Sequence, residues 1–327
     1  MNFLIIGLGS MGKRRIRCLQ ALGYKSDGIS GWDIRDDRRS ETQSLHGIKI
    51  ENDFSKVSPK KFDCIIISVP PDHHNQYIKY AIEHKIPAFV EASVIIEGLQ
   101  DLDNFAKQSD VLVAPSCTLL FHSSIQDIRK IVQNGEYGKV TNFSYHCGQY
   151  LPDWHPWEKI QDYYVSQKST GGAREIVPFE LTWIVDLFGI PRRIVGLYGK
   201  TMELGVDIDD TYVFSMEFDN FFGNMTIDVV ARYATRSLIL NLERGQITWN
   251  WDERKIRLYD AEKQQWIVLD EPQSQPVQGY NKNISDDMYI SELNAFIDAV
   301  KHNGGFPNTL EKDIQILHLL HRLEGEL

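Results

Sequence analysis

The sequence predicts an α/β protein with two domains, a parallel sheet between helices followed by an α+β domain built on a large, mostly antiparallel sheet. Over the first third of the chain, apolar runs alternate with amphipathic stretches, which is typical of a parallel sheet with helices on both faces. Beyond about residue 118, strand-like runs follow one another with turn signals between them, which favours an antiparallel sheet. The chain of 327 residues is long enough for two domains, which we expect at 1–118 and 119–327.

The first domain should contain five strands and three helices. The expected strands cover residues 3–6, 29–32, 64–69, 87–90 and 111–113. The expected helices cover residues 13–22, 74–84 and 99–108. Residues 64–67 (Cys-Ile-Ile-Ile) are apolar at every position, as in a parallel strand that is buried on both faces.

The second domain should begin with a helix at residues 123–134 that Gly135 ends. Expected strands follow at residues 140–150, 193–200, 211–218, 224–231, 237–242, 246–251, 255–259 and 265–269. Residues 271–283 contain proline and glycine and are expected to form a loop. Helices at residues 286–301 and 310–319 should close the chain.

A glycine-rich motif, G-x-G-x-x-G, lies directly after the first expected strand and directly before a helix. The first glycine permits a tight turn, the second lets the backbone approach a pyrophosphate, and the third lets helix and strand pack closely. The helix N-terminus then offers N–H groups to phosphate. This context predicts a Rossmann domain that binds a dinucleotide through Gly7, Gly9, Ser10, Met11 and Gly12.

An acidic residue, Asp33, stands at the end of the second expected strand. A carboxylate there accepts hydrogen bonds from the ribose hydroxyl groups and repels a 2′-phosphate, which favours NAD over NADP. Arg38 and its arginine neighbours follow closely and would soften that preference, so NADP stays open as a cofactor. The alternative interpretation is that Asp33 only starts a turn.

The composition excludes several classes of function. A formal net charge of −10 gives no electrostatic basis for binding nucleic acid. The basic residues 13–17 are interpreted as a solvated helix face, with phosphate contact as the alternative. We see no targeting segment and no apolar run of the roughly 18 residues that a membrane span needs, so we expect a cytoplasmic protein. The four cysteines are scattered and no residues have metal-ligand spacing, so we predict no metal site.

Several segments together resemble the glucose–fructose oxidoreductase/inositol dehydrogenase (Gfo/Idh/MocA) family along nearly the whole chain. They are residues 67–74 (ISVPPDHH), Val90-Glu91, Phe121-His122, residues 148–157 (GQYLPDWHPW), and Gly171-Gly172 with the helix that follows. The segment 148–157 resembles a subgroup that we associate with bacterial surface-sugar pathways.

The resemblance implies an NAD(P)-dependent oxidoreductase that acts on a sugar, a sugar nucleotide or a polyol. It also implies a ligand cleft between the domains and a homodimer or homotetramer formed through the open face of the C-terminal sheet. Cofactor contacts are then expected at Val69, Pro70, His74 and Glu91.

This sequence departs from the family at its acid–base positions. The family's Glu-Lys-Pro signature is Glu91-Ala92-Ser93 here, and Ile176 and Phe179 replace an Asp and a His of the glycine-led helix. None of the three replacements carries a titratable proton. The acid–base role has either moved to other residues, or the protein binds cofactor and ligand as a non-catalytic sensor. A third interpretation is an enzyme that uses bound NAD for transient oxidation.

Candidates for a relocated acid–base role lie near the glycine pair. Glu175 is the first candidate base, and Arg174 would clamp an anionic sugar group; alternatively these two residues pair with each other or lie on the surface. We expect the helix to begin near Pro178. Glu180 falls on an apolar helical face, so it is either a structural hydrogen-bonding residue or a pocket acid.

Further candidates lie in the loop before the glycine pair and at the start of the second domain. Glu91 and His155 are the other catalytic candidates, and the expected substrate contacts are His122, Trp154, His155, Tyr163, Arg174 and Glu175. The alternative for the loop around His155 is a plug packed on the sheet. A tyrosine–lysine pair from Tyr163 or Tyr164 with Lys168 is a weaker possibility.

Overall fold

The computed structural model describes residues 1–154, 158–272 and 286–325. The chain divides into two compact units, the first formed by Met1–Thr118 and Asp286–Ile314 and the second by Leu119–Ser285 and Gln315–Leu327. Residues 286–314, which we assigned to the second domain, thus pack with the first. His155 and Trp157, and most of the loop expected at 271–283, lie outside the described residues.

The first unit is a doubly wound α/β domain, as predicted. Its six strands lie in the order β3-β2-β1-β4-β5-β6 and pair in parallel throughout. The strands are β1 (Phe3–Ile6), β2 (Ile29–Trp32), β3 (Lys49–Ile50), β4 (Cys64–Ile67), β5 (Ala88–Val90) and β6 (Val113–Pro115). β1 and β4 are fully buried, which explains their continuous apolar sequence.

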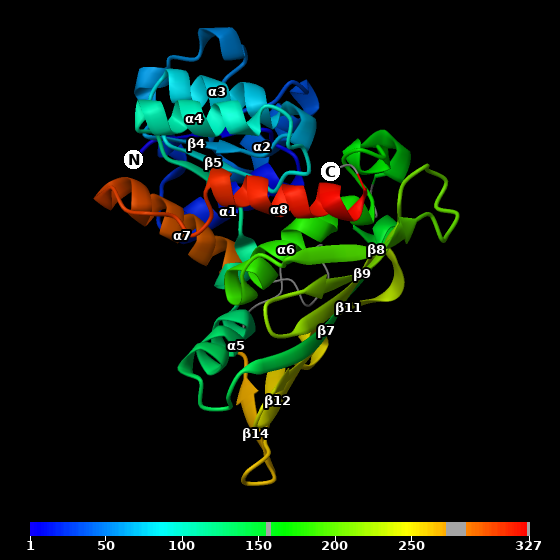
Figure 1. Cartoon of the computed structure of the whole chain (residues 1–327). Coiled ribbons are helices and arrows are strands. Elements are labelled where there is room, and N and C mark those ends of the chain that lie inside the picture. Colours follow the sequence, from blue (N-terminus) through cyan, green and yellow to red (C-terminus); the bar gives the residue numbers. More distant parts are fainter. Residues whose placement is uncertain (155–157, 273–285, 326–327) are drawn as a thin grey trace. The chain divides into compact units, whose positions relative to one another are not determined.

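The helices of this unit form layers on both faces of the sheet (Figure 1). They are α1 (Ser10–Ala21), α2 (Asp36–His46), α3 (His74–Glu83), α4 (Leu99–Ser109) and α7 (Asp287–His302). α3 packs against α4 on one face, while α1 packs against α7 on the other. Two of these elements, α2 and β3, were not predicted from the sequence. Of the 11 residues of α2 only Thr42 is buried, so the segment has no apolar periodicity to reveal it.

The second unit is built on a sheet of eight strands in the order β14-β13-β12-β11-β7-β10-β9-β8. All neighbours are antiparallel except β7 and β10, which are parallel. The strands are β7 (Val140–Tyr150), β8 (Arg193–Gly199), β9 (Thr211–Glu217), β10 (Phe222–Asp228), β11 (Val230–Leu242), β12 (Gly245–Asn250), β13 (Lys255–Asp260) and β14 (Gln265–Asp270). The predicted mostly antiparallel sheet is therefore confirmed.

Two helices, α5 (Ser123–Asn134) and α6 (Ala173–Phe188), pack against strands of this sheet (Figure 1). α5 has the predicted bounds and ends at Gly135, which has a left-handed conformation. A last helix, α8 (Leu310–Leu323), begins in the first unit and ends in the second. The start that we expected for α6, near Pro178, is wrong. Gly172, with φ +65°, turns the chain directly before Ala173, so the helix begins five residues earlier and contains Pro178.

Several large apolar side chains of the sheet are exposed to solvent. They are Val195, Leu197, Val213, Phe222, Ile239 and Val268. Along β9 and β10 such residues alternate with buried ones, so one face of the sheet is packed and the other is open. No helix among the described parts of the chain is long and apolar enough to cross a membrane.

Candidate functional site

The phosphate loop has the geometry that a dinucleotide requires. Gly7 has φ +92°, and a Cβ atom there would lie 2.5 Å from the Ser68 carbonyl oxygen. A Cβ at Gly12 would lie 1.9 Å from the Gly7 carbonyl oxygen, so neither glycine can carry a side chain. At Gly9 the nearest atom to a Cβ is Nη1 of Arg38 at 3.4 Å. The loop runs into the N-terminus of α1 at Ser10, a suitable place for a pyrophosphate.

Asp33 joins the loop to the end of β2. Its Oδ2 atom accepts a hydrogen bond from the Leu8 backbone at 2.7 Å, and its Oδ1 atom accepts one from the Arg35 backbone at 2.9 Å. Asp33 therefore does form a turn, and in addition it holds the phosphate loop. Each carboxylate oxygen keeps a lone pair for a ribose hydroxyl group. Arg38 Nη1 lies 3.9 Å from Oδ2, so its cation stands beside both the acid and the loop.

His74 shapes the loop that follows β4. Its Nε2 atom donates a 2.9 Å hydrogen bond to the carbonyl oxygen of Val69, the residue before Pro70. Burial lowers the pKa of His74 to about 4, so the ring is neutral at pH 7 and is no acid there. Its Nδ1 atom is buried without a hydrogen-bond partner among the described residues.

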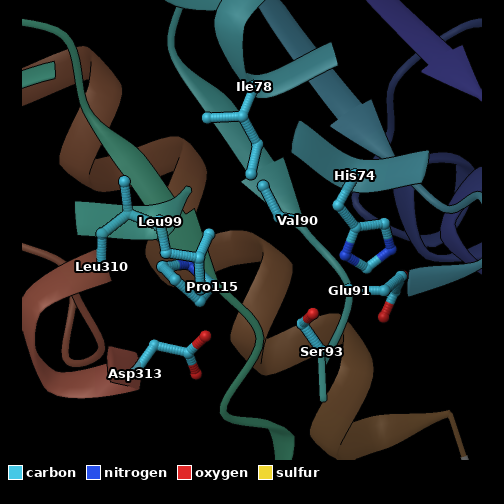
Figure 2. Close-up of a pocket in the computed structure, with 9 residues that line it drawn as sticks. All are labelled: His74, Ile78, Val90, Glu91, Ser93, Leu99, Pro115, Leu310 and Asp313. Atoms are coloured by element: carbon cyan, nitrogen blue, oxygen red, sulfur yellow. The ribbon is translucent and has the colours of Figure 1, made fainter. Parts of the chain in front are cut away.

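His74 also lines a small hollow in the first unit, beside Val90 at the end of β5 (Figure 2). The other lining residues are Ile78, Val90, Glu91, Ser93, Leu99, Pro115, Leu310 and Asp313. Its volume of about 10 Å³ is roughly what one water molecule needs, so a sugar does not fit. Burial raises the pKa of Asp313 to about 7.

Glu91 is held by an arginine of α1. Nε of Arg15 lies 2.7 Å from Oε1 of Glu91, and Nη2 lies 2.9 Å from Oε2. Arg15 Nη1 also contacts Glu292 Oε2 at 2.8 Å, and the guanidinium lies 4.4 Å above the Phe89 ring. Both oxygens of Glu91 are therefore engaged, which gives this carboxylate a structural role.

The basic stretch of α1 is not the solvated helix face that we expected. Arg15 is 0% exposed and Arg14 is 4% exposed. The local charge pattern could not show that these arginines are buried, because their carboxylate partners lie far away in the sequence. The partners are Glu91, Asp286 and Glu292. Glu292 also accepts hydrogen bonds from three consecutive residues: Ser116, Cys117 and Thr118. One feature of the sequence did indicate a buried ion pair, because Glu292 stands on an otherwise apolar helical face and a buried charge needs a partner.

In the second unit, Glu175 combines a buried oxygen atom with a strong hydrogen bond. The hydroxyl group of Tyr164 donates to Oε1 of Glu175 at 2.5 Å. The Oε2 atom is buried and has no hydrogen-bond partner among the described residues. Burial raises the pKa of Glu175 to about 7, against the opposing effect of the Tyr164 hydrogen bond. This carboxyl group can therefore take up or release a proton near neutral pH.

Arg174 is engaged with the C-terminal segment. Its Nε and Nη2 atoms contact the two carboxylate oxygens of Glu324 at 2.8 and 3.0 Å, and its Nη1 atom donates to the Ser169 carbonyl oxygen at 2.6 Å. Tyr212 donates to the same carboxylate at 2.8 Å. Arg174 is 9% exposed, and its nitrogen atoms already have acceptors, which disfavours the anion clamp that we expected.

Glu180 is a structural residue rather than a pocket acid. It is fully buried, and it accepts hydrogen bonds from Tyr145 at 2.8 Å, Trp183 at 3.1 Å and Arg236 at 2.8 Å. Three donors on one buried carboxylate match the rule that buried charges are paired.

Of the other predicted substrate residues that the structure describes, Tyr163 lies beside Tyr164, the hydrogen-bond partner of Glu175. The ring centroid of Tyr163 lies 6.2 Å from that of Tyr164. His122 packs against the rings of Trp249 and Trp251, at 5.5 and 4.8 Å, and burial lowers its pKa to about 4.

Two further candidates from the same loop have little support. Lys168 lies 3.5 Å from the carboxylate of Asp209, so its ammonium group has an acidic partner other than a tyrosine. Trp154 follows a short 3-10 turn, and its Nε1 atom is buried without a partner among the described residues.

Comparison with known families assigns two adjacent parts of the chain. Residues 1–116 match a family described as "Oxidoreductase family, NAD-binding Rossmann fold", and residues 125–248 match the "GFO/IDH/MocA C-terminal domain". The chain belongs to the Gfo/Idh/MocA family of NAD-binding oxidoreductases.

Two curated relatives of this Gfo/Idh/MocA chain are distant. A 2,7-anhydro-N-acetylneuraminate hydratase of Escherichia coli K12 is 21% identical over 226 residues, which are 67% of this chain and 59% of that protein. An uncharacterized oxidoreductase of Streptococcus pneumoniae is 21% identical over 228 residues, which are 67% of this chain and 60% of that protein. The chain thus matches less than two thirds of the length of these relatives.

Solved structures share the fold along the entire chain. An oxidoreductase from Agrobacterium radiobacter, in complex with NAD+, L-tartaric acid and magnesium, has a TM-score of 0.85 at 11% identity, covering 100% of this chain and 96% of that one. A levoglucosan dehydrogenase in complex with NADH and levoglucosan has a TM-score of 0.85 at 15% identity and the same coverage. A UDP-N-acetylglucosamine 3-dehydrogenase from Acidithiobacillus ferrooxidans has a TM-score of 0.80 at 14% identity, covering 100% and 97%.

Proposed function

We propose that this Gfo/Idh/MocA protein is an NAD-dependent oxidoreductase acting on a sugar, a sugar nucleotide or a polyol, with Glu175 as its acid–base residue. The observation that carries the proposal is the state of Glu175: one oxygen bound by Tyr164, the other buried without a partner, and a pKa of about 7. The names of the similar dehydrogenases favour a carbohydrate substrate.

The cofactor would be held by the first unit. The phosphate loop and α1 would take the pyrophosphate, Asp33 the ribose hydroxyl groups, and the loop after β4 one side of the nicotinamide half. The residues in these roles would be Gly7, Gly9, Ser10, Met11, Gly12, Asp33, Arg38, Val69, Pro70 and His74. Asp33 disfavours a 2′-phosphate, so we propose NAD rather than NADP.

The chemistry is oxidation of a hydroxyl group to a carbonyl group. Bound NAD supplies a hydride acceptor for the carbon-bound hydrogen. Glu175 accepts the hydroxyl proton on Oε2 as the C=O bond forms, and it returns that proton in the reverse direction. Glu91, with both oxygens engaged by Arg15, takes no part in this transfer. His155 remains the candidate for a second contact to the sugar hydroxyl groups.

The test is Glu175→Gln, which keeps the shape of the side chain and removes its charge. We expect NAD affinity to persist and the rate to fall by about 10²- to 10⁴-fold, the usual contribution of general acid–base catalysis. Glu262→Gln, at a side chain that is 72% exposed, is the matched control and should retain the rate. The substrate is first sought by following reduced nicotinamide with a panel of sugars, sugar nucleotides and polyols. An unchanged rate in Glu175→Gln would remove Glu175 from the mechanism.

A second candidate function is transient oxidation with bound NAD and no net redox change. It is favoured by one relative, whose name is that of a hydratase, because hydration changes no overall oxidation state. Product analysis separates the two, since an altered sugar with unchanged NAD supports the second function. The non-catalytic alternative rests on the apolar residues Ala92, Ile176 and Phe179. Tight NAD binding with no product from any sugar would support it.

We also propose that the open sheet face forms a homodimer or homotetramer. Exposed apolar patches of this kind mark interaction surfaces. Leu197, which is 81% exposed and lies opposite Val213 in the register of β8 and β9, is the residue to change. Leu197→Asp should lower the molar mass measured by analytical ultracentrifugation to that of one chain. A monomeric wild-type protein would contradict this proposal.

A further inference from the structure

The two oxygen atoms of Glu175 have different surroundings. Oε1 accepts the 2.5 Å hydrogen bond from Tyr164, at the short end for an O–H donor and a carboxylate. Oε2 is buried and without a partner among the described residues. A carboxylate that is fixed through one oxygen presents the other in a defined direction, and a buried acceptor with no partner costs free energy unless a ligand satisfies it.

The segment that carries Tyr164 is itself fixed. Thr170 Oγ1 donates to the Tyr164 carbonyl oxygen at 3.0 Å, and the backbone of Gly171 donates to Gln167 at 2.8 Å. A Cβ atom at Gly171 would lie 2.0 Å from the Val165 carbonyl oxygen. The glycine before α6 therefore allows the Tyr164 segment to pack directly against the start of the helix, where Glu175 lies.

The groups that face Glu175 are phenols rather than charges. Only burial and the Tyr164 hydrogen bond set its pKa, with no charged side chain of the described residues taking part. Tyr163 is the other titratable neighbour of Glu175. The pKa of Tyr163 is raised mainly by burial, next by the charge of Glu175, and least by the charge of Glu158. The adjacent cation, Arg174, is engaged with Glu324.

We propose that Tyr164 is a positioning residue for Glu175: its hydroxyl group orients the carboxylate so that Oε2 receives the substrate proton, and its hydrogen bond favours the ionised form of Glu175. This inference rests on the proposed function of Glu175. In the neutral carboxylic acid the bond from Tyr164 is weaker, so the hydrogen bond favours the charged form. Tyr164 thus acts through Glu175 and would supply the orientation that the missing family residues no longer give.

The experiment titrates Glu175 directly by ¹³C NMR of protein labelled at the glutamate carboxyl groups. The Glu175 signal is identified by its loss in Glu175→Gln. Tyr164→Phe removes one hydrogen bond to a charged group, worth about 1.5–3 kcal/mol, and should raise the titration midpoint by about one to two pH units. The midpoint of the pH–rate profile should move in the same direction. Tyr233→Phe, which removes a 3.2 Å phenol–carboxylate hydrogen bond to Asp252, should leave the Glu175 signal unchanged.

The possible results distinguish failure of this inference from failure of the proposed function. An unchanged Glu175 midpoint in folded Tyr164→Phe overturns the inference, whatever the activity. A raised midpoint in a protein whose rate does not depend on Glu175 supports the hydrogen bond's effect on ionisation but rejects the proposed function. If Tyr164→Phe does not fold, 3-fluorotyrosine at position 164 replaces it. That more acidic phenol strengthens the bond and should lower the midpoint, so an unchanged value again overturns the inference.

Discussion

Arg15 and Glu91 form a two-point ion pair inside the first unit, with nitrogen–oxygen distances of 2.7 and 2.9 Å. The two residues are 76 positions apart, one on α1 and the other directly after β5. Arg15 is also paired with Glu292 of α7, so one buried cation joins three segments of the chain. The first two predictions follow from this cluster.

Loss of the Glu292 carboxylate should strongly destabilise the protein. Glu292→Ala leaves Arg15 with one partner fewer and removes the acceptor of Ser116, Cys117 and Thr118. Breaking a buried pair of this kind costs about 3–5 kcal/mol, measured as the free energy of unfolding in urea. Glu311→Ala removes a carboxylate that is 61% exposed and pairs with Lys107, and should cost at most about 1 kcal/mol. Equal effects of the two variants would contradict the structural role of Glu292.

Glu91→Gln should affect stability rather than proton transfer. The variant keeps the side-chain shape but replaces the ion pair with Arg15 by neutral hydrogen bonds. We expect a lower Tm and a pH–rate profile of unchanged shape. The pH–rate profile is the decisive measurement. If the ionisation seen in the wild-type profile is absent from that of Glu91→Gln, then Glu91 is the acid–base residue.

The rate of hydroxyl oxidation should depend on the ionisation of Glu175. Its pKa is raised to about 7, and only the carboxylate can accept a proton. The rate should therefore rise as the pH passes through about 7 and level off above it, while the reverse reaction, which needs the protonated form, should level off below about pH 7 and fall above it. Steady-state rates measured between about pH 5 and 9 test this pH dependence, because that range spans the pKa of about 7. If Glu175→Gln shows the same rise of the rate with pH, the ionisation belongs to another group.

Asp313 should make the protein less stable as the pH rises. Burial raises its pKa from 3.8 to about 7 in the folded state, so between these values the folded chain holds a proton that the unfolded chain has released. The stabilising contribution is complete below about pH 4 and is lost as the pH rises to about 7. Asp313→Asn has no titrating group at this position. As the pH rises from about 4 to about 7, the wild type should therefore lose stability relative to the variant, measured as the free energy of unfolding. A difference that does not vary with pH would contradict the assignment.

Gly12→Ala should impair NAD binding. The added Cβ would lie 1.9 Å from the Gly7 carbonyl oxygen, so the phosphate loop must shift. We expect the affinity for NAD, measured by isothermal titration calorimetry, to fall at least tenfold. A tenfold loss corresponds to only about 1.4 kcal/mol of binding free energy. Gly305→Ala is the control within the same unit, because a Cβ there meets no atom within 4 Å. It should retain wild-type affinity.

The fold could be predicted from the sequence wherever burial leaves a periodic pattern. β1, β2, β7 and α5 have the predicted bounds, because each is an apolar run or an amphipathic stretch ended by a turn residue. α2 was missed because all its residues except Leu45 are polar or charged, and only Thr42 is buried. The start of α6 was placed too late because the proline was given more weight than the glycine before it.

The roles of the candidate residues were harder to predict, because several of their contacts join residues that are distant in sequence. Arg174 meets Glu324 across 150 positions, and Arg15 meets Glu292 across 277. Nothing local distinguishes such an arginine from a solvated one. Glu175 was identified as a candidate by its unusual place in the family pattern, whereas its bond to Tyr164 needed the loop geometry.

The position of Glu292 has a consequence for the order in which the protein is made. When the ribosome has completed β6 and the residues after it, the partner of Thr118 is still 174 residues from being synthesised. Until then, the nascent N-terminal unit contains a guanidinium at Arg15 with only part of its counter-charge, and three consecutive residues without their acceptor. The dinucleotide domain therefore completes this set of buried contacts only after Glu292, which follows all eight strands of the second sheet, has been synthesised. A chain released early would lack the carboxylate that completes its first domain, and we expect it to be a preferred target for chaperones and proteases.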